Sequence, residues 1–383
     1  MRKPGGRRMR IRRIAAVLLA GSCIAGCTGA WAVPAQETEA EDERPAVKKI
    51  AVYTYSYSSE YWGYVEQGCK AYDASNPSVV VDVKQPSSSI AADEQNALLK
   101  TDLELDRYDG YVIAAINQEK TQKVLQDVTF PVIALNSPLE ASCVIGGVST
   151  DNEAAAKAGA KKAVKMAQNL GRENPECVMI GGIESDFNQI NRLEGFRKGI
   201  EENGGVWLDA IYPTDKSAES ARAAMDQIMK EYPDGVAIVA CYNDTLAMNA
   251  LEESLEHPAF ADTVFLGFDG NGSICEQIMN DDKYQNMVTV AQNPYEMGFR
   301  AVERMAQYLE TQDTAKKDGK DADTAAPKDG KAAAQNEKTA APSSSEGDTS
   351  GNLEESGWED SGYAVINRDN AQERMLQIAN HLS

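Results

Sequence analysis

Short, β-branched apolar runs alternate along the chain with longer segments whose apolar residues repeat at helical spacing. Predicted strands lie at 50–57, 79–84, 110–116, 132–136, 144–148, 177–183, 206–211, 236–242, 264–268, 287–291 and 363–366. Predicted helices include 61–74, 152–169, 191–203, 217–230, 244–255 and 370–381. Such alternation is typical of βαβ units and parallel sheets. A single sheet of so many strands would be unusual, so we predict an α/β fold with two doubly wound, parallel-sheet lobes.

One long segment interrupts the alternation. Residues 311–352 contain no Val, Ile, Leu, Met, Phe, Tyr or Trp. Such a stretch cannot bury enough apolar surface to offset the conformational entropy of the chain. We therefore expect a disordered insertion over 311–361, before the strand and helix that end the chain. A surface insertion of this size is tolerable because the cost of loop closure grows only logarithmically with length.

The N-terminal segment has the pattern of a secretion signal. Residues 1–13 carry seven basic residues and no acid, and an apolar run follows at 14–20. That run is too short for a membrane-spanning helix, which needs about 20 apolar residues. The sequence Ile24-Ala25-Gly26-Cys27 resembles the lipobox of bacterial lipoproteins, in which the cysteine is acylated. The alternative is an ordinary signal peptide cut after Ala30 or Ala32.

We therefore expect a signal peptide at 1–26 and an acylated, flexible tether at 27–47, which is polar and acidic over most of its length. Lipid on Cys27 would hold the protein on the bacterial membrane without spanning it, at an extracytoplasmic location.

Charge and composition exclude several classes of function. The net charge of −21 argues against nucleic-acid binding, which needs a basic surface. Two histidines in the whole chain argue against a histidine-built metal site or a catalytic triad. Five cysteines lie beyond Cys27, without CxxC spacing, so we expect buried free thiols. No metal, cofactor or enzymatic activity is expected.

Polar and aromatic side chains follow the predicted strands. In open α/β sheets, ligands bind beyond the carboxyl ends of the strands. The candidate ligand-binding residues there are Tyr55, Ser59, Tyr61, Trp62, Asn136, Arg192, Asn243, Asp269 and Gln292. These groups can donate to and accept from a small polyhydroxylated molecule, while the aromatic rings cover its apolar faces.

Most of these candidates also have a structural interpretation. The alternatives are packing of the first helix for Tyr61 and Trp62, helix capping for Asn243, a turn for Asp269-Gly270, an ion pair with Glu194 or Glu201 for Arg192, and a solvated strand end for Gln292. Their shared location at strand ends favours a binding site.

The chain also resembles a known family from Lys48 to Tyr308 and from Gly362 to Asn370. The segments that carry the resemblance are IAVYTYSYSSEYWGYVEQG, STDNEAAAKAGAKKA, NRLEGFRKGI, CYNDTLAMNAL, GFDGN and VTVAQNPYEMG. They are similar to periplasmic sugar-binding proteins of the ribose-binding type, which are the receptors of ABC importers. The LacI-type repressors share the fold, but they carry a DNA-binding headpiece and no signal peptide.

The resemblance implies two lobes joined by three crossings, which close over a ligand. The first lobe would comprise 48–150 and 293–310, and the second 151–291 and 362–383. The family's stacking aromatics correspond to Tyr61 and Trp62, its first-strand contacts to Tyr55 and Ser59, its forked arginine to Arg192, and its second-lobe polar contacts to Asn243, Asp269 and Gln292. Asn136-Ser137 stands where the family often has Asp-Arg, so the hydroxyl pattern recognised is left open.

The implied function is a lipid-anchored, monomeric receptor that delivers a monosaccharide or similar ligand to an ABC permease. A second possibility keeps the fold but reports to a membrane sensor, a histidine kinase or a chemoreceptor. A third is an enzyme, which would need a paired acid and base or an activated nucleophile at the cleft.

Overall fold

The computed structural model describes residues 47–56, 59–184, 186–213, 215–317 and 357–382. The predicted signal peptide, most of the tether and the Cys27 lipid site lie outside the described residues. Within the described part of the chain, no helix is both long and apolar enough to cross a membrane.

The strands form two sheets, as the predicted strand count implies, and each sheet has six strands. The first has the order β11-β5-β4-β3-β1-β2 and is parallel throughout. Its strands are β1 (Lys48–Tyr53), β2 (Val79–Lys84), β3 (Gly110–Ile113), β4 (Val132–Leu135), β5 (Val144–Ser149) and β11 (Trp358–Asp360). The second has the order β12-β10-β9-β8-β6-β7, in which β12 alone runs antiparallel. Its strands are β6 (Glu176–Ile180), β7 (Val206–Ile211), β8 (Ile238–Cys241), β9 (Val264–Asp269), β10 (Met287–Gln292) and β12 (Tyr363–Ile366).

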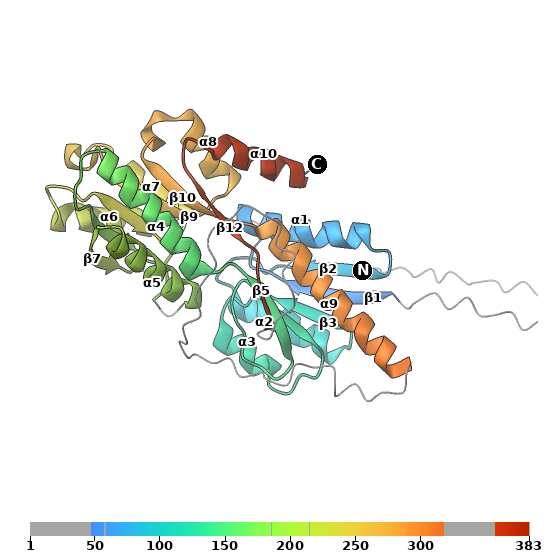
Figure 1. Ribbon diagram of the computed structural model, residues 1–383. Coiled ribbons are helices and arrows are strands. Elements are labelled where there is room, and N and C mark those ends of the chain that lie inside the picture. Colours follow the sequence, from blue (N-terminus) through green and yellow to red (C-terminus); the bar gives the residue numbers. More distant parts are fainter. Residues whose placement is uncertain (1–46, 57–58, 185, 214, 318–356, 383) are drawn as a thin grey trace, which may run out of the picture. The chain divides into compact units, whose positions relative to one another are not determined.

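Helices cover both faces of the first sheet (Figure 1). One face packs on α1 (Glu60–Ser75) and α9 (Pro294–Lys317), and the other on α2 (Ala92–Glu104) and α3 (Gln118–Leu125). Helix α9 follows the last parallel strand of the second sheet in sequence, yet it packs in the first lobe beside α1. The first lobe is therefore built from separate parts of the chain.

The second sheet is likewise covered on both faces (Figure 1). One core lies against α4 (Asn152–Asn169) and α5 (Phe187–Glu202). The other core contains residues of α6 (Ala218–Glu231), α7 (Asp244–Ser254), α8 (Gly272–Asn280) and α10 (Ala371–Leu382), together with the 3₁₀ turns Pro258–Phe260 and Asp282–Tyr284. Two α/β lobes with predominantly parallel sheets confirm the predicted fold class.

The chain passes between the lobes three times. It leaves β5 for α4, leaves β10 for α9, and leaves β11 for β12. Side chains join these crossings, because the Thr150 and Ser361 hydroxyl oxygens lie 3.2 Å apart and the Asn293 amide donates to the Ser361 carbonyl at 2.9 Å. The three passages are thus hydrogen-bonded to one another.

Several helices begin with a capping side chain at the carboxyl edge of a sheet. The Ncap residues Asn117, Asp151, Asp186, Ser217 and Asn243 each accept a backbone N–H from the first turn of their helix. Such caps satisfy amides that the helix itself leaves unpaired. They also hold the ends of these helices at the edge where the sequence places the candidate site.

The predicted insertion of 311–361 is too long at both ends. Helix α9 continues to Lys317, and Asp313 forms an ion pair with Lys48 of β1. Residues 358–360 form β11, which pairs with β5, and its Glu359 binds Arg300 of α9 at 3.0 Å. Charged contacts hold both segments, Trp358 also packs beside Gly147 of β5, and residues 318–356 lie outside the described residues.

Candidate functional site

Three aromatic rings gather at the carboxyl edge of the first sheet. Tyr55 follows β1, and its ring stacks on Trp62 with the centroids 4.5 Å apart. Tyr61 meets Trp62 edge to face at 5.2 Å. Tyr61 and Trp62 lie in the first turn of α1 and are buried in the core of the first lobe. Both side chains therefore pack α1 onto the first sheet, as the structural interpretation has it. The Tyr61 hydroxyl also makes polar contacts at the edge of the sheet.

A chain of polar contacts links Tyr61 to the second sheet. The Tyr61 hydroxyl lies 3.2 Å from Oδ1 of Asn136 and 3.4 Å from Oε1 of Gln292, and its single proton can be donated to one of them at a time. The Gln292 amide donates to Oδ1 of Asp269 at 2.8 Å. Gln292 is only 1% exposed, so it is not a solvated strand end.

Arg192 lies at the other end of this chain and is 3% exposed. Its Nε donates to Oδ1 of Asn152 and its Nη1 to the carbonyl oxygen of Tyr242, each at 2.8 Å. The guanidinium carbon lies 3.8 Å from the ring centroid of Phe268 and 4.6 Å from that of Tyr242. Its charged partner is Asp269, with Nη1 3.8 Å from Oδ1.

The alternative interpretation of Arg192, as a partner of Glu194 or Glu201 on the surface, is therefore wrong. On the same helix, Glu194 binds Lys198 and Glu201 binds Arg197, whereas Arg192 faces inward. A desolvated guanidinium is costly unless it is paired, and pairing here comes from neutral acceptors, aromatic faces and Asp269.

The remaining candidates, Asn136, Ser59 and Asn243, lie in different kinds of local structure. Asn136 follows β4 in a left-handed backbone conformation (φ 67°) that non-glycine residues seldom adopt. Ser59 occupies the Ncap position of α1 and is half-buried. Asn243 caps α7 through Oδ1, which accepts the Leu246 N–H at 3.1 Å. The capping alternative for Asn243 is thus correct, and its amide nitrogen is the part that could meet a ligand.

Burial shapes the electrostatics of the site. Desolvation raises the pKa of Asp269, although the nearby Arg192 charge opposes the shift. Asp244, at the start of α7, has a pKa raised well above its usual range by burial and then by the charge of Asp269. Burial also raises the pKa of the Tyr61 hydroxyl well above its usual value, so this group stays a hydrogen-bond donor. Two cations, Arg192 and Lys216, therefore act on Asp269, and burial disfavours the charged forms of Asp269 and Asp244.

Three residues near Arg192 were not predicted: Asn152, Tyr242 and Phe268. Asn152 begins the helix after the first crossing, and Tyr242 and Phe268 lie at the ends of two neighbouring strands. The rule that ligands bind at the carboxyl ends of strands, which identified Asn243 and Asp269, also applies to Tyr242 and Phe268. Their apolar character, however, is typical of the hydrophobic core.

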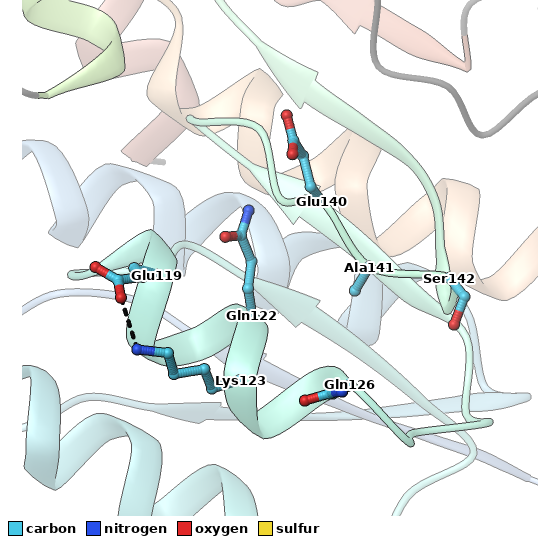
Figure 2. A pocket seen from close by; sticks show the side chains of 7 residues that line it. All are labelled: Glu119, Gln122, Lys123, Gln126, Glu140, Ala141 and Ser142. Carbon is cyan, nitrogen blue, oxygen red and sulfur yellow. Dashed lines mark hydrogen bonds and ion pairs between the residues drawn. The ribbon is translucent and has the colours of Figure 1, made fainter.

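A separate pocket of about 370 Å³ lies on the first lobe, between α3 and the residues after β4 (Figure 2). Its lining consists of Glu119, Gln122, Lys123, Gln126, Glu140, Ala141 and Ser142, none of which is a candidate site residue. Within the described residues, no cluster of three or more His, Cys, Asp or Glu side chains could hold a metal ion.

The sequence matches the family model described as the periplasmic binding protein domain over residues 50–313. The chain therefore belongs to the periplasmic binding protein family. Proteins of this family bind solutes without transforming them, so the chain is an extracytoplasmic binding protein and not an enzyme. No curated protein sequence is significantly similar to it.

Solved structures share the fold at low sequence identity. A periplasmic ribose ABC transporter protein of Conexibacter woesei has a TM-score of 0.63 and 19% identity, covering 86% of this chain and 95% of that one. A solute-binding protein of Actinobacillus succinogenes, with bound D-allose, has a TM-score of 0.64 and 16% identity, covering 85% and 99%. The arabinose-binding protein of Geobacillus stearothermophilus has a TM-score of 0.63 and 18% identity, covering 86% and 99%.

Proposed function

We propose that the protein is a lipid-anchored receptor that captures a sugar between its two lobes and delivers it to an ABC importer. The observation that carries the proposal is the run of polar contacts from Tyr61 through Gln292 and Asp269 to Arg192. It draws on α1 of the first lobe and on β9, β10 and α5 of the second. The solved structures with ribose, allose and arabinose in their titles support the sugar class.

The chemistry of these groups suits a polyhydroxylated ligand. A sugar hydroxyl can accept a hydrogen bond from Arg192 and donate one to Asp269 at the same time. Unpaired buried polar groups cost about 1–3 kcal/mol each, so a ligand lacking the matching hydroxyls is rejected. The stacked rings of Tyr55 and Trp62 provide an apolar face for the C–H groups of a sugar ring.

Ligand contacts from both lobes would favour the closed arrangement of the lobes, because only contacts that differ between the two states shift their populations. The closed lobes would then present one composite surface to the permease. Acyl chains on Cys27 would keep the receptor beside that permease.

A thermal-shift screen against D-ribose, D-allose, L-arabinose, D-fucose and glycerol tests the binding step. A sugar present at 100 times its Kd adds about 2.7 kcal/mol of stability and raises the melting temperature. A screen in which none of these compounds raises it would contradict the proposal. Delivery is tested by uptake of the radiolabelled sugar in cells with and without the gene, where transport is expected to depend on the protein.

A further inference from the structure

Gly270 follows β9 directly, and side chains from two distant helices hold both of its backbone polar groups. Its N–H donates to Oδ2 of Asp244 in α7 at 2.7 Å. Its carbonyl oxygen accepts from Nε of Arg374 in α10 at 3.3 Å. The residue has φ +61°, and a Cβ there would lie 2.2 Å from Cβ of Ala291. Only glycine fits this position, and its orientation is set from both sides.

The contacts of Gly270 also bear on the neighbouring carboxyl group, because the Gly270 N–H lies in the peptide plane that follows Asp269. Asp269 has φ +114°, which side-chain-bearing residues rarely adopt and which persists only where the surroundings enforce it. In that conformation its Oδ1 accepts from Gln292 and lies 3.8 Å from Nη1 of Arg192. The contacts that hold Gly270 therefore aim Asp269 at the candidate site.

Asp244 makes its contacts inside the lobe. It is 4% exposed, and its second oxygen accepts from the Thr289 hydroxyl of β10 at 2.5 Å. Both carboxyl oxygens thus contact protein groups inside the lobe, and the residue joins α7, β10 and Gly270.

Arg374 extends the same arrangement to the crossings. It is 5% exposed, and its Nη2 donates to the Gln292 carbonyl oxygen at 2.6 Å while its Nη1 donates to Oδ1 of Asn293 at 3.3 Å. The Asn293 amide in turn binds the Ser361 carbonyl in the third crossing. One guanidinium therefore contacts both the loop after β9 and the passage from β10 to α9.

We propose that Asp244 and Arg374 are positioning residues that set ligand affinity by holding Gly270, and with it the Asp269 carboxylate, without touching the ligand. This inference rests on the proposed function, since it assigns Asp269 to the sugar site. It adds that the C-terminal helix α10 takes part in forming that site.

Hydrogen exchange without any ligand tests the holding contacts. We compare hydrogen exchange of the backbone amides in peptides covering 264–276 between the wild-type protein and four variants. The variants are Asp244→Ala, Asp244→Asn, Arg374→Met and Arg374→Lys. Exchange in this segment should be faster in the Ala and Met variants. Asn should restore much of the protection, because its Oδ1 can still accept the Gly270 N–H. The control is Arg368→Ala, which removes an exposed arginine paired with Asp282 just before the same helix.

Calorimetric titration with D-ribose, D-allose and L-arabinose tests the effect on affinity. Asp244→Ala and Arg374→Met should each raise Kd by at least about tenfold. Arg374→Lys keeps the charge and reaches fewer acceptors, so it should lie between wild type and Met. Arg368→Ala should bind as the wild type does, and circular dichroism verifies that each variant is folded.

Unchanged exchange in 264–276 would overturn the inference, and so would faster exchange with unchanged affinity. If the wild type itself binds none of the three sugars, the proposed function fails for them. The exchange measurement still decides, independently, whether Asp244 and Arg374 hold Gly270.

Discussion

Nη1 of Arg192 lies 3.8 Å from Oδ1 of Asp269, close enough for charge attraction but beyond the length of a good hydrogen bond. Both groups are largely buried, with side chains 3% and 17% exposed. The gap leaves each with bonding capacity toward a third group, and a sugar hydroxyl can serve both at once. This geometry makes the pair the centre of the candidate site.

Replacing Arg192 should therefore impair binding more than any surface change on its helix. Arg192→Ala should weaken sugar affinity at least tenfold, because a hydrogen bond to a charged group contributes about 1.5–3 kcal/mol and 1.4 kcal/mol is a factor of ten. The unliganded variant should also be less stable, since Asn152 and the Tyr242 carbonyl lose their donors. Isothermal titration measures the first effect and urea unfolding the second.

Arg197→Ala is the matched control, because Arg197 lies on the same helix, is exposed and pairs with Glu201 one turn away. Exposed pairs contribute about 0–1 kcal/mol, so affinity and stability should hardly change. Equal affinities for the two variants would place the binding site elsewhere.

Trp62 should report ligand binding by its fluorescence. Its ring stacks on Tyr55 beside the candidate polar groups, so a bound sugar changes its environment. Trp62→Phe should abolish most of the ligand-induced fluorescence change and weaken binding moderately, because a smaller stacking face remains. Trp207→Phe in β7 should preserve the signal. A signal that survives in the first variant and disappears in the second would contradict the assignment.

The buried carboxyl of Asp244 should make stability depend on pH. Its pKa is raised in the fold by burial and by Asp269, with Arg374, Cys241 and Cys275 as its other titratable neighbours. A raised pKa means that the folded state holds a proton which the unfolded state has lost. Stability from this group is then full below the unfolded pKa of about 3.9 and is lost as pH rises through the folded pKa.

Asp244→Asn cannot ionise, so it should lose less stability than the wild type between about pH 5 and about pH 8. Urea unfolding at the two pH values gives the comparison, with exposed Asp234→Asn as a control. Parallel losses in all three proteins would refute the expectation.

Much of the fold is predictable from the sequence, because the strands and helices of βαβ units differ clearly in the spacing of their apolar residues. The strand ends are less clear: β3 ends at Ile113, although Ala114 and Ala115 beyond it are 1% and 3% exposed. These two alanines are buried as deeply as the strand, so apolar character continues past its last residue.

Helix α2 shows why some helices lack a clear hydrophobic pattern in the sequence. Its buried face includes Gln95, Asn96 and Asp102, which a hydrophobic pattern reads as solvent-facing. Gln95 binds the carbonyl oxygens of Thr54 and Ala114, and Asp102 binds the Tyr53 hydroxyl. Such polar packing depends on tertiary partners. The convergence of several candidate polar groups was easier to predict, since polar groups at strand ends meet at one edge of a parallel sheet.

The composition of residues 320–352 predicts that they contribute little to the fold. With no large apolar residue to bury, their removal should leave melting temperature and sugar affinity nearly unchanged. Extending the deletion through 358–360 should destabilise the protein, because it removes β11 and the Glu359 contacts with Arg300 and Arg304. Thermal unfolding of the two deletion variants checks this, and equal melting temperatures would count against it.

Membrane attachment should depend on Cys27, which lies outside the described residues. Cys27→Ser removes the acylation site of the lipobox-like sequence, so the protein should leave the membrane fraction or retain its signal peptide. Membrane fractionation with mass spectrometry of the N-terminus distinguishes these results. Cys23→Ser is the control, and unchanged membrane retention together with an unchanged N-terminus in Cys27→Ser would contradict lipid attachment at Cys27.

The elements on either side of residues 318–356 belong to the same lobe. Helix α9 ends at Lys317 against the first sheet, and β11 begins at Trp358 beside β5. A fluorescent protein spliced into this segment would be carried by the first lobe alone, while a dye on α10 would be carried by the second. If the lobes close on a ligand as proposed, energy transfer between the two labels would change, which makes the segment a natural insertion point for a ligand sensor.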